Sequence, residues 1–207
     1  PIICVGGPCA CNPEPIADFC DIIFLGDGEE STNEVLDLLK ECKKNGLSKH
    51  EFLMRAKDIR GIYVPLFYDA YYNEDGTLKE LVAKNGAPEK VKKAVVSDMN
   101  SVYYPDRFVV PFINIVHDRA VEEIFRGCIR GCRFCQAGFT YRPIREKSVD
   151  VINGQCKRLI QNTGYDEISL CSLSTSDHSH VNEMLSSLID WTEKSHINLS
   201  LPSLRVD

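Results

Sequence analysis

Short apolar runs and helical periodicity alternate along the first part of the chain. Residues 2–7 and 21–30 each contain a continuous apolar run that leads into glycines, a pattern typical of buried strands. Residues 29–44 carry apolar side chains at helical spacing, and Ser48 with Glu51 matches a capping box that opens a further helix. This order predicts an open α/β sheet, in which ligands bind beyond the carboxyl ends of the strands.

The last third of the chain contains three strand-like runs separated by two amphipathic helices. The first helix is predicted over residues 148–164 and closes at Gly164; the second starts from a cap at Ser176 or Asp177. The order strand, helix, strand, helix, strand predicts parallel strands joined by right-handed crossovers. Because three strands cannot close a barrel, we expect the first part of a TIM-type barrel.

The residues between these two regions have a different pattern. Aromatic and β-branched runs flank Asp75–Gly76, which predicts a β-hairpin, and a proline-punctuated extended stretch follows. We therefore expect an α/β chain in three parts. They are the C-terminal part of a Rossmann-like domain in residues 1–45, a connector with a hairpin in 46–113, and the first βαβαβ of a partial barrel in 114–207.

Composition narrows the class of protein. The 207 residues are 43% hydrophobic and 26% charged, as in ordinary globular proteins, and the net charge of −6 gives no case for nonspecific binding to nucleic acid or anionic lipid. We find no apolar run of about 20 residues and no signal peptide, so we expect a cytoplasmic protein without a membrane partner. Because the chain begins without Met inside a predicted strand, we also expect a fragment.

Three of the ten cysteines share a tight spacing, C-x3-C-x2-C, directly after a predicted strand. Cys128, Cys132 and Cys135 offer thiolates, which are soft ligands for zinc, copper(I) or an iron–sulfur cluster. Structural zinc sites want four ligands, and the chain has no second C-x2-C pair. A 4Fe–4S cluster fits one short loop better and would leave one iron open. Three reduced thiols without a metal are the alternative.

The spacing, with Phe134 before the last cysteine, resembles the signature of radical SAM enzymes. The resemblance implies a 4Fe–4S cluster whose open iron binds S-adenosylmethionine (SAM), a partial barrel with the cluster loop after its first strand, and reductive cleavage of SAM to a 5′-deoxyadenosyl radical. It also implies a low-potential electron donor such as flavodoxin or ferredoxin. Phe134 would lie along the adenine. Where many members have a glycine-rich GGE, this chain has SLCSLSTSD, so Ser172 and Ser174 are the corresponding SAM-binding candidates, with serines that merely end a strand as the alternative.

The amino-terminal run "VGGP…NPEPIADFCDIIFLGDGEE" resembles the closing half of a cobalamin-binding domain. Together with "HDRAVEEIFRGCIRGCRFCQAGFTYRP" it is similar to an uncharacterised group of radical SAM proteins that contain such a domain. The resemblance implies cobalamin as an optional further cofactor. The glycines that would line its tail, with ordinary turn glycines as the alternative, are Gly6, Gly7, Gly26 and Gly28.

Several alternatives stay open at this point. The reaction is methyl transfer to an unactivated carbon if cobalamin binds, or a modification such as methylthiolation of RNA or protein if it does not. A different class is a non-catalytic module for binding or electron transfer, stabilised by an iron–sulfur cluster or by zinc. Arg126, Arg130 and Arg133 make the cysteine loop basic, with solvated side chains as the default. Cys156 and Cys171 are expected in the core.

Overall fold

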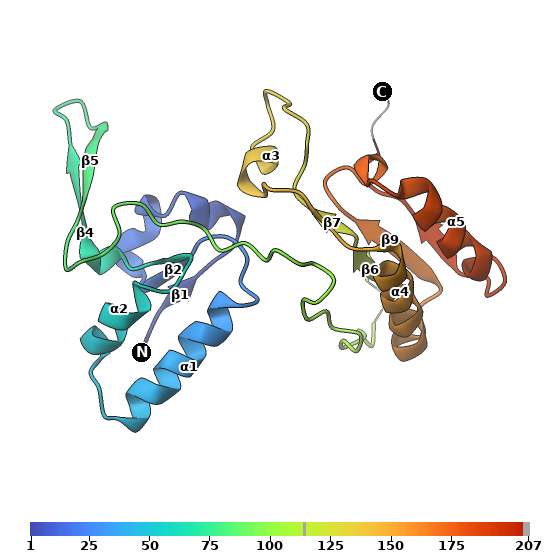
Figure 1. The fold of residues 1–207 in the computed structure, drawn as a ribbon, viewed down its shortest axis with the longest axis horizontal. Helices are drawn as coiled ribbons and strands as arrows, with labels where there is room; N and C mark the ends of the chain where they lie inside the picture. Colours follow the sequence, from blue (N-terminus) through green and yellow to red (C-terminus); the bar gives the residue numbers. More distant parts are fainter. Residues whose placement is uncertain (114, 205–207) are drawn as a thin grey trace. The chain divides into compact units, whose positions relative to one another are not determined.

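The computed structural model describes residues 1–113 and 115–204 and divides the chain into two compact units, Pro1–Val96 and Ser97–Asp207 (Figure 1). Both units combine helices with a small sheet, which is entirely parallel in the second unit and has one parallel and one antiparallel pair in the first, and this confirms the predicted α/β class. The predicted boundaries at 45 and 113 stay predictions. In the structure, residues 46–96 pack with residues 1–45 as a single unit.

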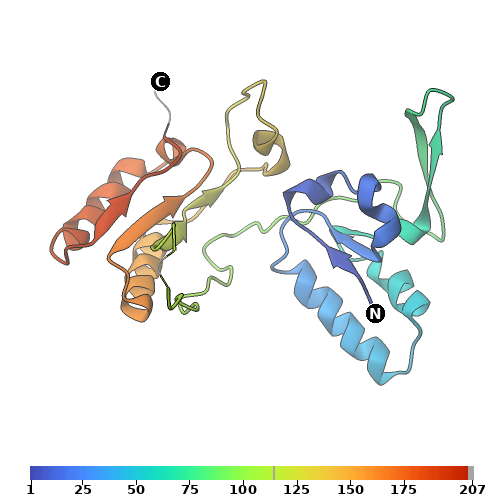
Figure 2. The same cartoon turned by 180° about the vertical axis from the view of Figure 1, so that it is seen from behind.

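The first unit has a sheet of order β1-β2-β3, in which β1 is parallel and β3 antiparallel to β2. Because neighbouring strand residues point to opposite faces, Ile22 packs against helices α1 and α2, and Ile23 packs against the 3₁₀ helices η1 and η2. Helices α1 and α2 lie on one side of this sheet and the 3₁₀ helices on the other (Figure 2). The bounds are β1 (Cys4–Val5), η1 (Pro8–Cys11), η2 (Glu14–Phe19), β2 (Ile22–Phe24), α1 (Ser31–Lys44), α2 (Lys49–Ala56), β3 (Ile62–Tyr63), η3 (Pro65–Phe67), β4 (Tyr68–Tyr72) and β5 (Leu78–Ala83).

The predicted capping box at the start of α2 is confirmed. The Glu51 amide donates to Ser48 Oγ at 3.3 Å, and the Ser48 amide donates back to Glu51 Oε2 at 2.8 Å. This fixed start turns Phe52 into the core, where it packs with Phe67, and both are almost fully buried. Part of the predicted connector therefore completes the core of the first unit.

The predicted hairpin around Asp75–Gly76 is also confirmed. Strands β4 and β5 pair antiparallel and project away from the sheet of their unit (Figure 1). Asp75 Oδ1 accepts from the Thr77 amide at 2.9 Å, which holds the turn. Tyr71 and Tyr72 of strand β4 are exposed.

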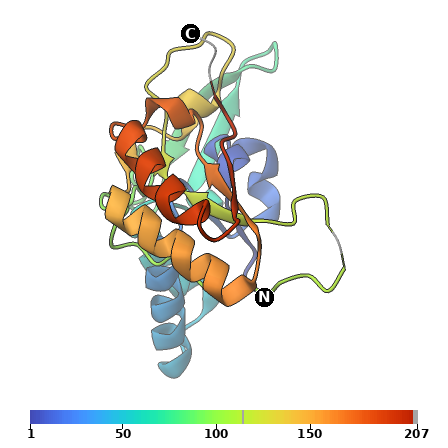
Figure 3. The ribbon, with the colours of Figure 1, turned by 90° about the vertical axis from the view of Figure 1, so that its right-hand side faces the viewer.

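The second unit contains the predicted strand–helix–strand–helix–strand order. Its sheet has the order β10-β9-β6 with both pairs parallel, and α4 and α5 lie side by side on one face (Figure 3). The bounds are β6 (Ala120–Glu123), β7 (Phe125–Arg126), α3 (Ala137–Thr140), β8 (Arg145–Glu146), α4 (Val149–Thr163), β9 (Glu167–Cys171), η4 (Thr175–Asp177), α5 (Val181–Thr192) and β10 (Asn198–Ser200).

Helix α4 packs into the core through the apolar face that its sequence pattern predicts. Ile152, Cys156 and Leu159 of α4 are fully buried, and Gly164 closes this helix in the left-handed conformation at φ 75°. The start of α5 was predicted wrongly. This helix begins at Val181, because Ser176 and Asp177 belong to the separate 3₁₀ turn η4.

Cys171 was also predicted wrongly. Ile168 and Leu170 take the helix-facing positions of β9, so alternation along the strand places Cys171 on the opposite face, where it is exposed. Cys156, in contrast, is buried in the core as predicted.

An ion pair lies inside the second unit. Lys147 Nζ is 2.8 Å from Glu122 Oε1, and neither side chain is exposed to solvent. The same ammonium donates to Gln155 at 2.7 Å and lies 3.9 Å from the centre of the Tyr104 ring. Burial raises the pKa of Glu122 to about 7, against the opposing effect of Lys147. Among the described residues, no helix is long and apolar enough to cross a membrane.

Candidate functional site

The cysteine loop is the segment between strands β7 and β8, and it follows β6, the first parallel strand of its unit. Strands β7 and β8 pair antiparallel, with Arg126 opposite Arg145, and so join the two ends of the loop. Gly127 begins the loop at φ 92°, and a Cβ at this position would lie 2.7 Å from the Pro143 carbonyl oxygen. Only glycine allows this approach of two backbone segments without strain.

The three cysteines lie on this loop with partly buried side chains. The Cys135 amide donates to the Cys132 carbonyl at 3.1 Å, which makes a tight turn of the C-x2-C half. Cys128 Sγ accepts from the Arg130 amide at 3.4 Å. Within the described part of the chain, no three His, Cys, Asp or Glu side chains are gathered closely enough to hold a metal ion. The structure thus places the cysteines on one loop without converging their sulfur atoms.

The donor set nevertheless fits an iron–sulfur cluster. Three thiols in one short loop are the soft ligands that such a cluster takes, and amide donors to sulfur are among the groups that tune its potential. Residues 127–136 contain no helix or strand that would resist a rearrangement on binding. The assignment of Cys128, Cys132 and Cys135 as ligands stays a prediction.

Phe134 stands beside the last cysteine with 92% of its surface exposed. A ring this exposed is available to stack on a planar ligand, as the prediction for adenine requires. The described contacts do not test this role.

The second predicted group of SAM-binding residues follows β9. Ser172 is partly buried, and its Oγ shares a 3.0 Å hydrogen bond with Thr175 Oγ1, which donates to the Pro202 carbonyl at 2.7 Å. Ser174 is 1% exposed, and its Oγ has no hydrogen-bond partner among the described residues. Ser172 is therefore the more accessible of the two candidates, and Ser174 would need a local opening to reach a ligand. Both stay predictions.

The register of the sheet brings these two segments to one edge. Glu123 at the end of β6 pairs with Cys171 at the end of β9, and the strands are parallel. The cysteine loop and residues 172–177 therefore both extend from the carboxyl ends of neighbouring strands, where active sites of barrels lie.

One contact joins these two segments directly, two more join residues next to them, and none of the three was predicted. Arg130 Nε donates to Asp177 Oδ2 at 2.9 Å, and its Nη2 donates to Asp177 Oδ1. Near the base, the Ser179 amide donates to Glu146 Oε1 at 2.9 Å, and His178 Nε2 lies 3.1 Å from the Lys147 carbonyl oxygen. The signal available in the sequence was the pair of opposite charges, but residues 47 apart cannot be paired without a fold.

The three loop arginines differ in their surroundings. Arg126 forms two hydrogen bonds of 2.8 and 2.9 Å with Glu123, and Arg130 is paired with Asp177. Arg133 is exposed. The default expectation of solvated arginines therefore holds for Arg133, while the positive charge of the other two is balanced by carboxylates.

Cys171 is a fourth cysteine to consider, because it lies at the carboxyl end of β9 and is paired with Glu123, the last residue of the strand before the cysteine loop. Although the residue is exposed overall, partial desolvation of its sulfur and, after it, the carboxylate of Glu123 raise the pKa of Cys171. A raised pKa disfavours the thiolate form, so Cys171 is a weaker candidate for a fourth ligand than a thiol with an ordinary pKa.

The glycines predicted to line a cobalamin tail lie at the carboxyl ends of β1 and β2. Gly26 has φ 99°, and a Cβ there would lie 2.1 Å from the Ala94 carbonyl oxygen, so a crossing backbone segment already fills this position. Gly7 has the same φ, but a Cβ there would meet nothing within 4 Å. Gly26 is thus explained by close packing, whereas the cofactor role of Gly6, Gly7 and Gly28 stays a prediction.

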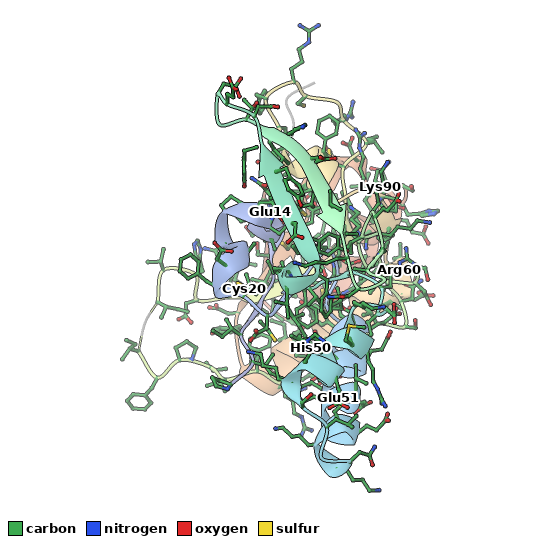
Figure 4. All side chains as sticks on the ribbon, turned by 90° about the vertical axis from the view of Figure 1, so that its left-hand side faces the viewer. Glu14, Cys20, His50, Glu51, Arg60 and Lys90 are labelled. Atoms are coloured by element: carbon green, nitrogen blue, oxygen red, sulfur yellow. The ribbon has the colours of Figure 1, made fainter. Side chains whose placement is uncertain are left out.

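The first unit also has a cleft of about 850 Å³ that contains none of the predicted site residues. Glu14, Cys20 and His50 line it from η2, the turn after η2, and α2 (Figure 4). Two of its carboxylates are balanced by lysines, with Asp21 bound to Lys49 and Asp69 bound to Lys84. The lining also includes the carboxylates of Glu14 and Asp18, so acidic side chains outnumber the two lysines in this cleft.

Comparisons with known proteins agree with the resemblance seen in the sequence. Residues 1–65 match the family model described as radical SAM proteins, N-terminal. The fold is similar to that of the cobalamin-dependent S-adenosylmethionine radical enzyme OxsB, with a TM-score of 0.57 and 16% identity over 97% of this chain. The predicted resemblance to radical SAM proteins is confirmed.

A relative of this radical SAM-like chain is the uncharacterized protein MJ0966 of Methanocaldococcus jannaschii. It is 26% identical over all 207 residues. The chain spans 38% of the length of MJ0966 and 25% of the OxsB chain, whose solved structure contains aqua-cobalamin and S-adenosylmethionine. At this level of identity the likeness to OxsB shows the fold alone.

Proposed function

We propose that the full-length protein is a radical SAM enzyme, with Cys128, Cys132 and Cys135 as the ligands of its 4Fe–4S cluster. When bound, the cluster and SAM would supply a 5′-deoxyadenosyl radical that abstracts hydrogen from a substrate. One observation carries the proposal. The cysteine loop and residues 172–177 extend from the carboxyl ends of neighbouring parallel strands, because Glu123 and Cys171 are paired in register.

The residues of this chain would have distinct tasks. The three thiolates would hold the cluster and, being three, would leave one iron without a cysteine ligand from the loop. Phe134, with its exposed ring, offers a stacking surface for adenine, and the Ser172 hydroxyl, whose proton is donated to Thr175, would accept a hydrogen bond from the methionine amino group. The protein thereby orients the cofactor, which performs the difficult chemistry.

Anaerobic reconstitution of the full-length protein tests the cluster. We expect about four irons per chain, consistent with a 4Fe–4S cluster on three cysteines. Cys128→Ala should lose most of this iron. Cys9→Ala, at an exposed cysteine distant in sequence from the loop, should keep it. One tightly bound zinc with no iron would contradict the assignment and favour a zinc-stabilised module.

Cobalamin-dependent methyl transfer is the finer hypothesis, supported by the similarity of fold to OxsB. The open surface at Gly7 is compatible with a cofactor tail, whereas a glycine at position 26 is already accounted for by its close contact with Ala94. Binding of hydroxocobalamin to the full-length protein, followed by its visible spectrum, tests this hypothesis. No spectral change at saturating cobalamin would instead favour a modification such as methylthiolation of RNA or protein.

A cluster without SAM cleavage would place the protein in the other class, that of binding or electron-transfer modules. The two classes are separated by adding SAM and a strong reductant to the reconstituted protein. Only the enzyme would form 5′-deoxyadenosine, and a flavodoxin or ferredoxin should then replace the chemical reductant.

A further inference from the structure

The tip of the cysteine loop is tied to the segment that follows β9 by a bidentate ion pair. Arg130 lies between Cys128 and Cys132, and its guanidinium donates two parallel hydrogen bonds to Asp177. The Asp177 side chain is only 8% exposed. A bidentate pair of this kind fixes the relative position and orientation of the two segments, and not only their charge balance.

Arg130 is itself held in place from the far side of the loop. Its carbonyl oxygen accepts from Arg142 Nη2 at 3.2 Å, and its amide donates to Cys128 Sγ. Movement of the Arg130 backbone would therefore change both its hydrogen bond to Cys128, the first cysteine, and its hydrogen bond from Arg142 at the end of the loop.

Asp177 is equally connected to the predicted SAM-binding segment. It ends the turn η4, whose first residue, Thr175, bonds to the Ser172 hydroxyl and to the Pro202 carbonyl. The Asp177 amide donates to the Ser174 carbonyl at 2.9 Å. Hydrogen bonds within this turn therefore link Asp177 to Ser174 directly and to Ser172 through Thr175.

We propose that the Arg130–Asp177 pair is a positioning device that sets the placement of the Ser172–Asp177 segment relative to the cysteine loop, and so controls SAM affinity without holding the cluster. This inference rests on the proposed function. Neither residue is a thiol or lies among the predicted ligands, so iron content and SAM binding should respond differently when the pair is broken.

The test uses full-length protein, reconstituted anaerobically, with iron content and the electron paramagnetic resonance spectrum of the reduced cluster measured during SAM titration. Arg130→Gln and Asp177→Asn should keep the iron content of the original protein. Each should need roughly 3- to 30-fold more SAM for the half-maximal spectral change, the range expected for a positioning contact. Arg130→Lys, which keeps the charge but not the two parallel bonds, should fall between.

Two further variants make the result specific to the pair. Arg133→Gln removes the same charge from the same loop at an exposed side chain and should stay within about twofold of the original SAM affinity. The exchange Arg130→Asp with Asp177→Arg should recover part of the affinity lost in the single variants. Circular dichroism of every variant checks that it is folded.

The outcomes separate this inference from the proposed function. An original protein without a cluster, or without a SAM-dependent spectrum, overturns both. A responsive original protein whose Arg130 and Asp177 variants bind SAM like Arg133→Gln overturns the positioning role alone. Parallel loss of iron and SAM affinity in folded Arg130→Gln and Asp177→Asn also overturns it, because the pair would then serve the cluster itself.

Discussion

Gly127 lies directly against Pro143, so that a Cβ on Gly127 would come within 2.7 Å of the Pro143 carbonyl oxygen. Gly127→Ala should therefore open the base of the cysteine loop and destabilise the protein by about 1–3 kcal/mol, from the positive φ and the close contact together. Thermal unfolding measures this change. Gly131→Ala is the matched control within the loop, since a Cβ there meets nothing within 4 Å, and an equal loss in both variants would contradict the explanation.

Gly26 and Gly7 provide a second matched pair, because both have φ 99°. Gly26→Ala should destabilise the first unit more than Gly7→Ala, since only the Cβ on Gly26 would collide with the Ala94 backbone. We expect a difference of about 1–3 kcal/mol in the free energy of unfolding, the cost of overpacking. Denaturant titration of the two variants should separate them, and equal stabilities would mean that the contact with Ala94 is dispensable.

The buried pair of Glu122 and Lys147 should behave as a unit. Glu122→Gln leaves a buried ammonium without its charged partner and should cost about 3–5 kcal/mol of unfolding free energy. Replacing both residues by methionine should cost clearly less, because no charge then remains in the core. Asp37→Asn, at an exposed pair with Lys40, should change stability by less than about 1 kcal/mol. Chemical denaturation of the three variants distinguishes these cases.

Cys171 offers a test of the ligand count. Because burial and Glu123 raise the pKa of Cys171, we expect Cys171→Ala to keep the iron content of the reconstituted protein. Each of Cys128→Ala, Cys132→Ala and Cys135→Ala should lower it sharply. A loss of iron in Cys171→Ala equal to the loss in the loop variants would mean that Cys171 is a fourth ligand and that no position is left for SAM.

Local signals in the sequence predicted the local structure well. Ser48 and Glu51 predicted the start of α2, Asp75–Gly76 predicted the hairpin, and Gly164 predicted the end of α4. Each of these features depends on residues only a few positions apart. The alternation of Ile168 and Leu170 also indicates the exposed position of Cys171, against the general preference of cysteine for the core.

Contacts between distant residues could not be predicted in the same way. Asp177 matches a helix cap by sequence, yet in the structure it binds Arg130, and α5 begins only at Val181. Gly26 matched a cofactor-lining glycine, and its close partner Ala94 lies far along the chain. In both cases the contact joins residues far apart in the sequence and exists only after folding.

Formation of 5′-deoxyadenosine tests the central claim most directly. The full-length protein, reconstituted anaerobically and given SAM and dithionite, should release 5′-deoxyadenosine, detected by chromatography and mass spectrometry. Cys128→Ala should release none above background, and Arg133→Gln should match the original protein. A fully loaded cluster that binds SAM but yields no 5′-deoxyadenosine, or release unchanged in Cys128→Ala, would contradict the account.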